Sequence, residues 1–272
     1  MEYRTNLHTH TNFCGGNFNV RELAASALLK GFDSLGFSEQ LYIDFDKGNS
    51  LAREDEKSYI ESVLSLKNEM KGYMDIYLGC EYDYFSAETD LSPYEYIIGS
   101  VGYVEKDGAR ICADEEEYSV VRFVKENFGG NFYKYCKAYY ENVIKMCGKC
   151  DFDIIANFDL AAKYNEGDKY FDEDDSRYLI PAIEAMETLI KKGVIFEISP
   201  HFAYEKVRRE ITPNKNLIMA VKNYGGSVII GSGGDDISSL GYKFADSVKI
   251  AEDCGFTSVK YFSDGEFLDF PI

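Results

Sequence analysis

His8 and His10 are the residues whose types and spacing most directly suggest chemistry, because they lie two positions apart in the segment NLHTHT at residues 6–11. This segment reads as a β-strand, in which side chains two positions apart point to the same face. Two imidazoles on one face can bind one metal ion. The chain has three histidines, and the third, His201, lies far downstream. A metal site would therefore need ligands from other parts of the chain.

The elements that must position these histidines alternate between predicted strands and predicted helices. Apolar runs predict seven core strands with helical segments between most pairs. These strands start near residues 3, 34, 75, 95, 152, 194 and 227. The alternation favours an α/β fold with a parallel sheet, either open or closed into a barrel, in a single domain over residues 1–272.

Polar residues at the ends of these strands favour the barrel. The residues at or just beyond the predicted carboxyl ends are His8, Glu39, Glu81, Asn157, His201 and Ser232. In a barrel those ends converge on one face, where active sites are built. We therefore expect the polar residues to meet at the mouth of a barrel.

Three segments carry further structural predictions. Residues 94–104 read as one buried strand, and Asp107-Gly108 beyond it is typical of a tight turn. The acidic stretch at residues 166–175 is predicted to be a solvated connection, because like charges repel and hydrate. Residues 239–255 are predicted to form a helix.

Charge and cysteine content narrow the classes of partner. The chain has 29 basic and 47 acidic residues, a net charge of −18, which repels phosphate backbones and anionic lipid surfaces. Nucleic acid and membrane partners are therefore not expected, although a pocket can still gather enough cationic charge for a small anionic substrate. Seven scattered cysteines and an N-terminus without a signal region predict a reduced, cytoplasmic protein. No apolar run reaches the roughly 18 to 20 residues that span a bilayer.

His8, His10 and Glu81 form the candidate metal site. Two histidines and one glutamate at converging strand ends match the three protein ligands of a catalytic zinc site with an open position. A bound ion would lower the pKa of a coordinated water and supply a nucleophile. The alternative is that the two histidines form hydrogen bonds in a polar barrel mouth and bind no ion.

Six segments, in order, resemble the motifs of one family. NLHTHTNFC is similar to an opening HxH motif, GFSEQ to a TEH motif and GCEYDY to a GxExD/Y motif. Further along, IIGSVGYV, IIANFDLAAKYN and IIGSGGDDISSLGYKF resemble SVH, GHFDL and GSDAH motifs. These are motifs of the PHP (polymerase and histidinol phosphatase) superfamily, in its histidinol-phosphatase branch. The resemblance implies a distorted TIM-like (β/α)7 barrel that carries up to three divalent ions and hydrolyses a phosphate monoester.

The chain departs from this pattern at most of the metal-ligand positions. His8, His10 and Glu81 keep the ligand types of the family. Six other positions do not: Gly16, Gln40, Gly102, Asn157 and Asp235 stand where the pattern has histidine, and Gly233 stands where it has aspartate. Glycine offers no side-chain ligand, and the amides offer only a neutral oxygen. The resemblance therefore implies that the three retained ligands could bind one ion together. The other two ions of the family would lack their ligands in this chain.

Asp235, Asp236 and His201 are candidate replacement ligands for that ion. The two aspartates lie in a glycine-rich segment just beyond Gly233, and His201 follows the sixth predicted strand. Alternatively, the aspartates only cap a helix that begins near Ser238, and His201 is a surface loop residue. Glu39 and Asp235 are also candidate catalytic carboxylates.

Three basic residues are candidates for binding phosphate. Arg208 and Arg209 lie in HFAYEKVRRE, where the family carries an arginine-bearing loop, and either could bind a phosphate in bidentate fashion. Lys163 follows the fifth predicted strand. The alternative for all three is ordinary ion pairing on an acidic protein.

Two functional hypotheses follow. The first is a phosphomonoesterase that uses one divalent ion (Zn, Mn or Fe) and acts on a small phosphorylated molecule such as histidinol phosphate, with reduced activity. The second is a pseudoenzyme on the same barrel that needs no metal and serves as a small-ligand-binding or regulatory protein. A polymerase-associated module is disfavoured, because the sequence shows no polymerase domain and the net charge is −18.

Overall fold

A nine-stranded sheet forms the centre of the computed structural model, which describes residues 2–272. The strands, in their order across the sheet, are β1 (Thr5–Asn6), β2 (Ser34–Gln40), β3 (Asp75–Asp83), β4 (Tyr96–Ser100), β7 (Ile154–Ile155), β8 (Ile195–Ile198), β9 (Ser227–Ile230), β10 (Ser258–Ser263) and β11 (Glu266–Pro271). All neighbouring strands pair in parallel except β10 and β11. The order across the sheet follows the order along the chain, as in a barrel.

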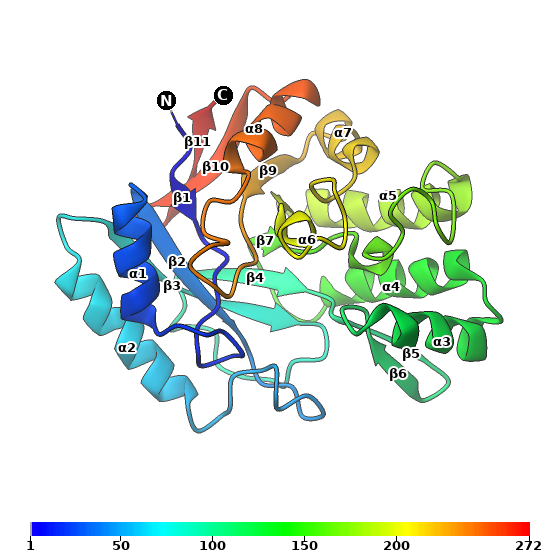
Figure 1. The fold of residues 1–272 in the computed structure, drawn as a ribbon, viewed down its shortest axis with the longest axis horizontal. Coiled ribbons are helices and arrows are strands. Elements are labelled where there is room, and N and C mark those ends of the chain that lie inside the picture. Colours follow the sequence, from blue (N-terminus) through cyan, green and yellow to red (C-terminus); the bar gives the residue numbers. More distant parts are fainter. Residues whose placement is uncertain (1) are drawn as a thin grey trace.

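Helices surround this sheet (Figure 1). They are α1 (Val20–Leu29), α2 (Glu56–Glu69), α3 (Glu117–Phe128), α4 (Phe132–Met146), η1 (Leu160–Ala162), α5 (Ser176–Lys191), α6 (His201–Tyr204), α7 (Lys215–Asn223) and α8 (Phe244–Asp253). A small hairpin of β5 (Tyr103–Lys106) and β6 (Ala109–Cys112) projects beside α3. None of the helices over residues 2–272 is both long and apolar enough to span a membrane.

The sheet curls so that the chain beyond β1 meets the chain beyond β9. The Asn6 side-chain amide donates to Ser232 Oγ at 2.8 Å, and the His10 backbone N–H donates to the Gly234 carbonyl at 3.0 Å. The predicted α/β barrel of PHP type is confirmed as a curled, mainly parallel sheet. All seven predicted strands are present, whereas β10 and β11 were not predicted.

Tyr96 anchors the strands that carry the histidines. Its ring is buried in the interior enclosed by the curled sheet. Its hydroxyl donates to the carbonyls of Leu7 at 2.5 Å and Phe37 at 3.1 Å. A Cβ at Gly36 or Gly79 would lie within 2.3 Å of the Tyr96 side chain. Glycine at both positions therefore makes room for the ring that fixes the backbone just before His8.

The structure corrects three sequence predictions. The expected strand at 94–104 is divided into β4 and β5, because the Gly102 N–H turns to donate to the Asp83 carboxylate. The expected helix at 239–255 begins only at Phe244, since Gly241 and Lys243 have positive φ angles. The acidic stretch at 166–175 is not wholly solvated, because its Phe171 and Glu173 are buried.

Candidate metal centre

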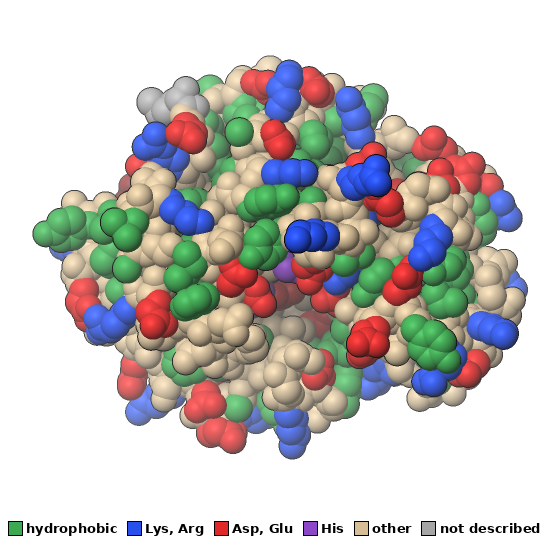
Figure 2. Space-filling view, viewed as in Figure 1, with side chains coloured by type: hydrophobic (Ala, Val, Ile, Leu, Met, Phe, Trp, Pro, Cys, Tyr) green, Lys and Arg blue, Asp and Glu red, His purple; other side chains and the backbone are tan. Residues whose placement is uncertain are grey.

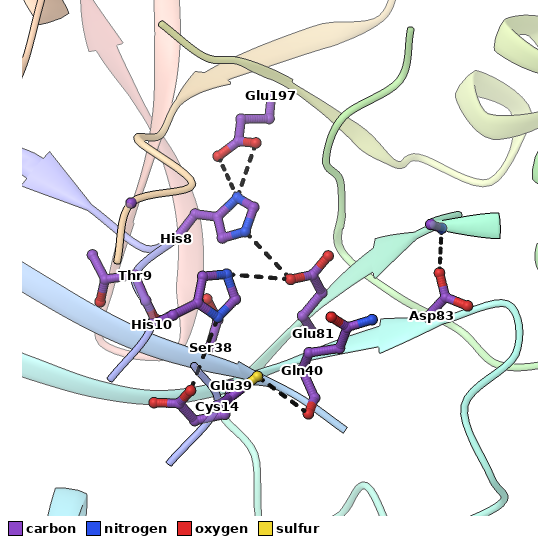
Figure 3. Close-up of polar contacts among 12 residues, drawn as sticks. His8, Thr9, His10, Cys14, Ser38, Glu39, Gln40, Glu81, Asp83 and Glu197 are labelled. Atoms are coloured by element: carbon purple, nitrogen blue, oxygen red, sulfur yellow. Dashed lines mark hydrogen bonds and ion pairs between the residues drawn. The ribbon is translucent and has the colours of Figure 1, made fainter. Parts of the chain in front are cut away.

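His8, His10 and Glu81 converge on one point at the carboxyl ends of the strands. The prediction of a strand over residues 6–11 is wrong in its extent, because β1 ends at Asn6 and only Thr9 beyond it forms a β-bridge, to Gly234. Both histidines therefore lie in the segment after β1, and Glu81 lies on β3. Glu81 Oε2 is 3.5 Å from His8 Nε2 and 3.4 Å from His10 Nε2 (Figure 3). Ligand atoms of all three residues lie within 4.8 Å of one another. The structure therefore brings together the three residues that the sequence selected.

Glu197 on β8 holds His8 from behind. Its carboxylate oxygens lie 2.9 and 3.0 Å from His8 Nδ1, and its side chain is 2% exposed. This contact places a proton on Nδ1 and leaves Nε2 facing Glu81 (Figure 3). A carboxylate behind a histidine ligand is a common orienting arrangement at metal sites. A Cβ at Gly231 would lie 1.9 Å from Glu197 Oε1, so a glycine makes room for this carboxylate.

The sequence interpretation missed Glu197. Its signal was a single acidic residue inside the otherwise apolar run VIFEIS, where solvent exposure is not expected. A buried charge of this kind requires a charged or hydrogen-bonded partner.

Glu39 on β2 lies on the other side of the His10 ring. Its Oε1 accepts hydrogen bonds from the Thr11 N–H at 2.8 Å and the Thr11 hydroxyl at 2.5 Å. Its Oε2 lies 3.9 Å from His10 Nδ1. Among the described residues, neither Glu39 Oε2 nor His10 Nδ1 has a hydrogen-bond partner.

Burial and neighbouring charged side chains shift the pKa values of the residues in this group. Burial alone would lower the pKa of His8, but Glu197 and Glu81 outweigh burial and raise the pKa to about 10. Burial lowers the pKa of His10 to about 4, which keeps its ring neutral. Burial would raise the pKa of Glu81, but His8 and His10 hold it at about 2. Burial raises the pKa of Glu39 to about 8.

This donor set fits a divalent cation. Glu39, Glu81 and Glu197 are all buried around two histidines, so the group has an excess of acidic side chains. Imidazole nitrogens with one or two carboxylates suit zinc and similar first-row ions. His8, His10 and Glu81, called the bis-histidine site below, could hold such an ion.

A cavity of about 910 Å³ opens onto the bis-histidine site. In Figure 2, histidine is visible at the bottom of a hollow, with acidic side chains around it. The acidic residues that line the cavity besides Glu81 are Asp46, Asp114, Glu115, Glu116, Glu205 and Asp235. Arg110 also lines it, with its guanidinium over the rings of Phe45 and Phe85. The cavity is therefore strongly acidic.

The candidate replacement ligands are placed differently from one another. His201, at the start of α6, and Asp235 both line the cavity. Asp236 lies outside the cavity lining, and its carboxylate accepts hydrogen bonds from the Tyr204 hydroxyl at 2.6 Å and the Ser239 N–H at 3.0 Å. Asp236 thus stabilises the turn before α8.

The positions at which the sequence departs from the family pattern differ in the space around their side chains. Gln40, Gly102, Asn157 and Gly233 line the cavity. A Cβ at Gly233 would meet His201 and His8 only at ordinary contact distances of 3.6 and 3.7 Å. A Cβ at Gly16 would lie 2.7 Å from the Thr11 carbonyl oxygen, so a side chain there requires the backbone to move.

The predicted phosphate-binding residues are engaged in other contacts. Arg208 is buried, donates to the Ala162 carbonyl at 3.1 Å and pairs with Glu173 at 3.2 Å. The Arg209 side chain is 94% exposed. Lys163 pairs with Asp114 and with Glu205 at 2.8 Å. None of the three belongs to the described residues that line the cavity, although both partners of Lys163 do.

The fold and the ligand group together define an α/β barrel protein with candidate metal-ligating residues at the carboxyl ends of its strands. The chain belongs to the PHP domain family, whose model matches residues 6–201. The resemblance found in the sequence is therefore confirmed.

Relatives of the chain are histidinol-phosphatase-like. It is 25% identical over 264 residues to the "Probable histidinol-phosphatase" of Deinococcus radiodurans, covering 93% of this chain and 95% of the relative. Two crystal structures share its fold at 17% identity. One is a Listeria monocytogenes protein assigned as a histidinol phosphatase, with a TM-score of 0.77 over 89% of this chain and 99% of that chain. The other is the Lactococcus lactis histidinol phosphate phosphatase complexed with zinc, L-histidinol and phosphate, with a TM-score of 0.69 over 98% and 99%.

Proposed function

We propose that the protein is a metal-dependent phosphate monoester hydrolase that acts on a small phosphorylated molecule of the histidinol phosphate type. The observation that carries this proposal is the convergence of His8, His10 and Glu81, with His8 held by Glu197 at 2.9 Å. One zinc, manganese or iron ion would be held by these residues. The Lactococcus lactis relative supports the class of ion and ligand, since it was solved with zinc, L-histidinol and phosphate.

An ion at this site supplies Lewis acidity toward a phosphoryl oxygen and makes water a stronger nucleophile at neutral pH. The chain's own residues orient the reactants. Glu197 fixes the His8 ring, and Glu81 lies between the two imidazoles. Acidic side chains on the cavity wall, including Asp114, Glu115 and Glu116, favour a substrate with a cationic group such as an amine.

The substituted ligand positions lower the expected rate. A second metal ion normally stabilises both the attacking and the leaving oxygen. Gln40, Gly102 and Asn157 offer no imidazole for such an ion. Of the basic candidates for phosphate recognition, Lys163 fits the proposal best, because its partners Asp114 and Glu205 line the cavity.

Phosphate release from histidinol phosphate tests the proposal. Protein stripped of metal with a chelator is expected to be inactive and to regain activity with zinc, manganese or iron. His8→Ala and Glu81→Gln should remove that activity, whereas Glu187→Gln, on the outer part of α5, should retain it. Protein that binds an ion but releases no phosphate under any of these conditions would contradict the proposal.

The second candidate is a ligand-binding pseudoenzyme on the same barrel. The observation that favours it is the placement of Arg208 and Arg209 away from the cavity, together with glycine at positions 102 and 233. This candidate predicts that histidinol or phosphate raises the melting temperature without turnover. Measuring melting temperature and phosphate release on one preparation separates the two functions.

A further inference from the structure

A second group of metal-ligating atoms lies on the far side of the His10 ring from Glu81. Ligand atoms of His10, Cys14 and Glu39 lie within 4.8 Å of one another. His10 Nε2 faces Glu81 at 3.4 Å, whereas Nδ1 faces Glu39 Oε2 at 3.9 Å (Figure 3). The two nitrogens of one ring therefore point toward two different groups of ligands.

Two atoms of this second group are buried without partners. The Glu39 side chain is 0% exposed, and Thr11 satisfies only its Oε1. Within residues 2–272, Glu39 Oε2 and His10 Nδ1 make no hydrogen bond. Burying a carboxylate without a compensating charge is costly. The free oxygen lies 3.9 Å from His10 Nδ1, in a group whose third member is Cys14, and a cation bound there would compensate its charge.

Cys14 completes the group and connects it to solvent. Its thiol is directed at the backbone carbonyls of Asn49 at 3.2 Å and Gln40 at 3.9 Å, which are weak sulfur contacts. Cys14 also lines the cavity. An ion in the cavity can therefore reach the sulfur, and a coordinated thiol loses its proton.

We propose that Cys14 Sγ, Glu39 Oε2 and His10 Nδ1 form a second divalent-cation site, the thiolate site, which competes with the bis-histidine site for the His10 ring. Binding releases two protons to solvent at neutral pH, one from the Cys14 thiol and one from the buried Glu39 carboxyl. A neutral imidazole has one lone pair, so His10 serves one site at a time through one of its nitrogens. The thiolate site does not depend on the proposed hydrolase activity.

The chemistry of the two donor sets separates the ions they prefer. The thiolate site offers a sulfur and a carboxylate, whose two negative charges neutralise a dication. Thiolate ligands select zinc, cobalt or cadmium over magnesium and manganese. The bis-histidine site offers two nitrogens and one carboxylate and lacks a soft ligand. Thiophilic ions are therefore expected at the thiolate site, and manganese at the bis-histidine site.

Cobalt titration of the metal-free protein tests this proposal without measuring activity. Cobalt bound to a thiolate gives a sulfur-to-metal charge-transfer band in the near ultraviolet, which nitrogen and oxygen ligands do not give. The band is expected in the wild type and absent from Cys14→Ser. Cys112→Ser is the matched control, because Cys112 is also a half-buried thiol that lines the cavity but belongs to neither ligand group. It should retain the band.

His8→Ala tests the competition between the two sites. Removing His8 weakens the bis-histidine site and leaves the His10 ring free for Cys14 and Glu39, so the thiolate band should strengthen at limiting cobalt. A band that persists in Cys14→Ser, or one that does not rise in His8→Ala, would overturn the proposal. A Cys14-dependent band in a protein that hydrolyses no phosphate ester would contradict the proposed function and leave the thiolate site standing.

Discussion

His8 is held by Glu197, a residue that does not line the cavity, and this contact can be tested by substitution. Replacing Glu197 with Gln keeps the shape of the side chain but removes the negative charge beside His8 Nδ1. Loss of such an orienting carboxylate typically lowers metal affinity by about 10- to 100-fold. We expect the manganese dissociation constant of the bis-histidine site to rise by that factor, measured by isothermal titration calorimetry on metal-free protein. Glu187→Gln serves as the exposed control, and equal affinities of the two variants would refute the orienting role.

Gly233 stands where the family pattern has aspartate, and a carboxylate can be introduced there as a test of the bis-histidine site. Its Cβ would have ordinary contacts with His8 and His201, although its φ of +55° favours glycine. Aspartate tolerates this region better than most residues, at a cost of roughly 1 kcal/mol. Gly233→Asp should therefore bind manganese at least about tenfold more tightly, with a slightly lower melting temperature when metal-free. Gly233→Asn carries the same strain without the charge, and a similar gain in that variant would argue against ligation.

The sequence predicted part of the site because that part follows local rules. His8 and His10 flank Thr9, which forms a single β-bridge to Gly234 just beyond β1, and Glu81 lies near the carboxyl end of β3. The spacing of two and the position at a strand end therefore bring them to the barrel mouth. Glu197 was missed because its partner, His8, lies 189 residues away along the chain, and no local pattern indicates that pairing. The direction of Arg208 could not be predicted, since it depends on Glu173 in a distant buried loop. Long-range pairs of this kind are set by tertiary packing.

At the scale of elements, the hairpin of β10 and β11 was not predicted from the sequence. Strands β10 and β11 are joined at Asp264 and Gly265, which both have positive φ angles. Asp-Gly between two strand-like runs is a strong hairpin signal. The same dipeptide predicted the turn at 107–108, where β5 and β6 meet. The strand signal at 258–271 is weak because most of its residues are half-buried or exposed at the edge of the sheet.

Tyr96 links three strands beneath the site, and its hydroxyl can be removed without changing the packing of its ring. Tyr96→Phe leaves the buried carbonyls of Leu7 and Phe37 without this donor. An unsatisfied buried group costs about 1–3 kcal/mol. We expect the free energy of unfolding in urea to fall by that amount, and manganese affinity to fall as well because Leu7 precedes His8. Tyr73→Phe, at an exposed position, should change neither quantity. Unchanged stability in Tyr96→Phe would show that the hydroxyl does not anchor β1.

At the scale of the whole molecule, a buried polar network connects the far side of the barrel to the helices. Asp159 follows β7 and accepts a hydrogen bond at 2.9 Å from the N–H of Asn214, the residue that caps α7. Asn214 in turn donates to Glu173 at 2.8 Å, and Glu173 pairs with Arg208. The network has two buried carboxyls for one guanidinium. Charge balance inside the fold therefore depends on pH.

The pKa of Asp159 determines the direction in which stability changes with pH. Burial raises its pKa to about 6, with Arg208 acting in the opposite direction. The folded protein therefore binds more protons than the unfolded chain between about pH 4 and pH 6, and this carboxyl lowers stability as pH rises. Two pKa units correspond to about 3 kcal/mol. Asp159→Asn cannot ionise, so its free energy of unfolding in urea should gain about that much relative to the wild type from pH 4 to pH 7. Parallel stability curves for the two proteins would contradict a buried, titrating Asp159.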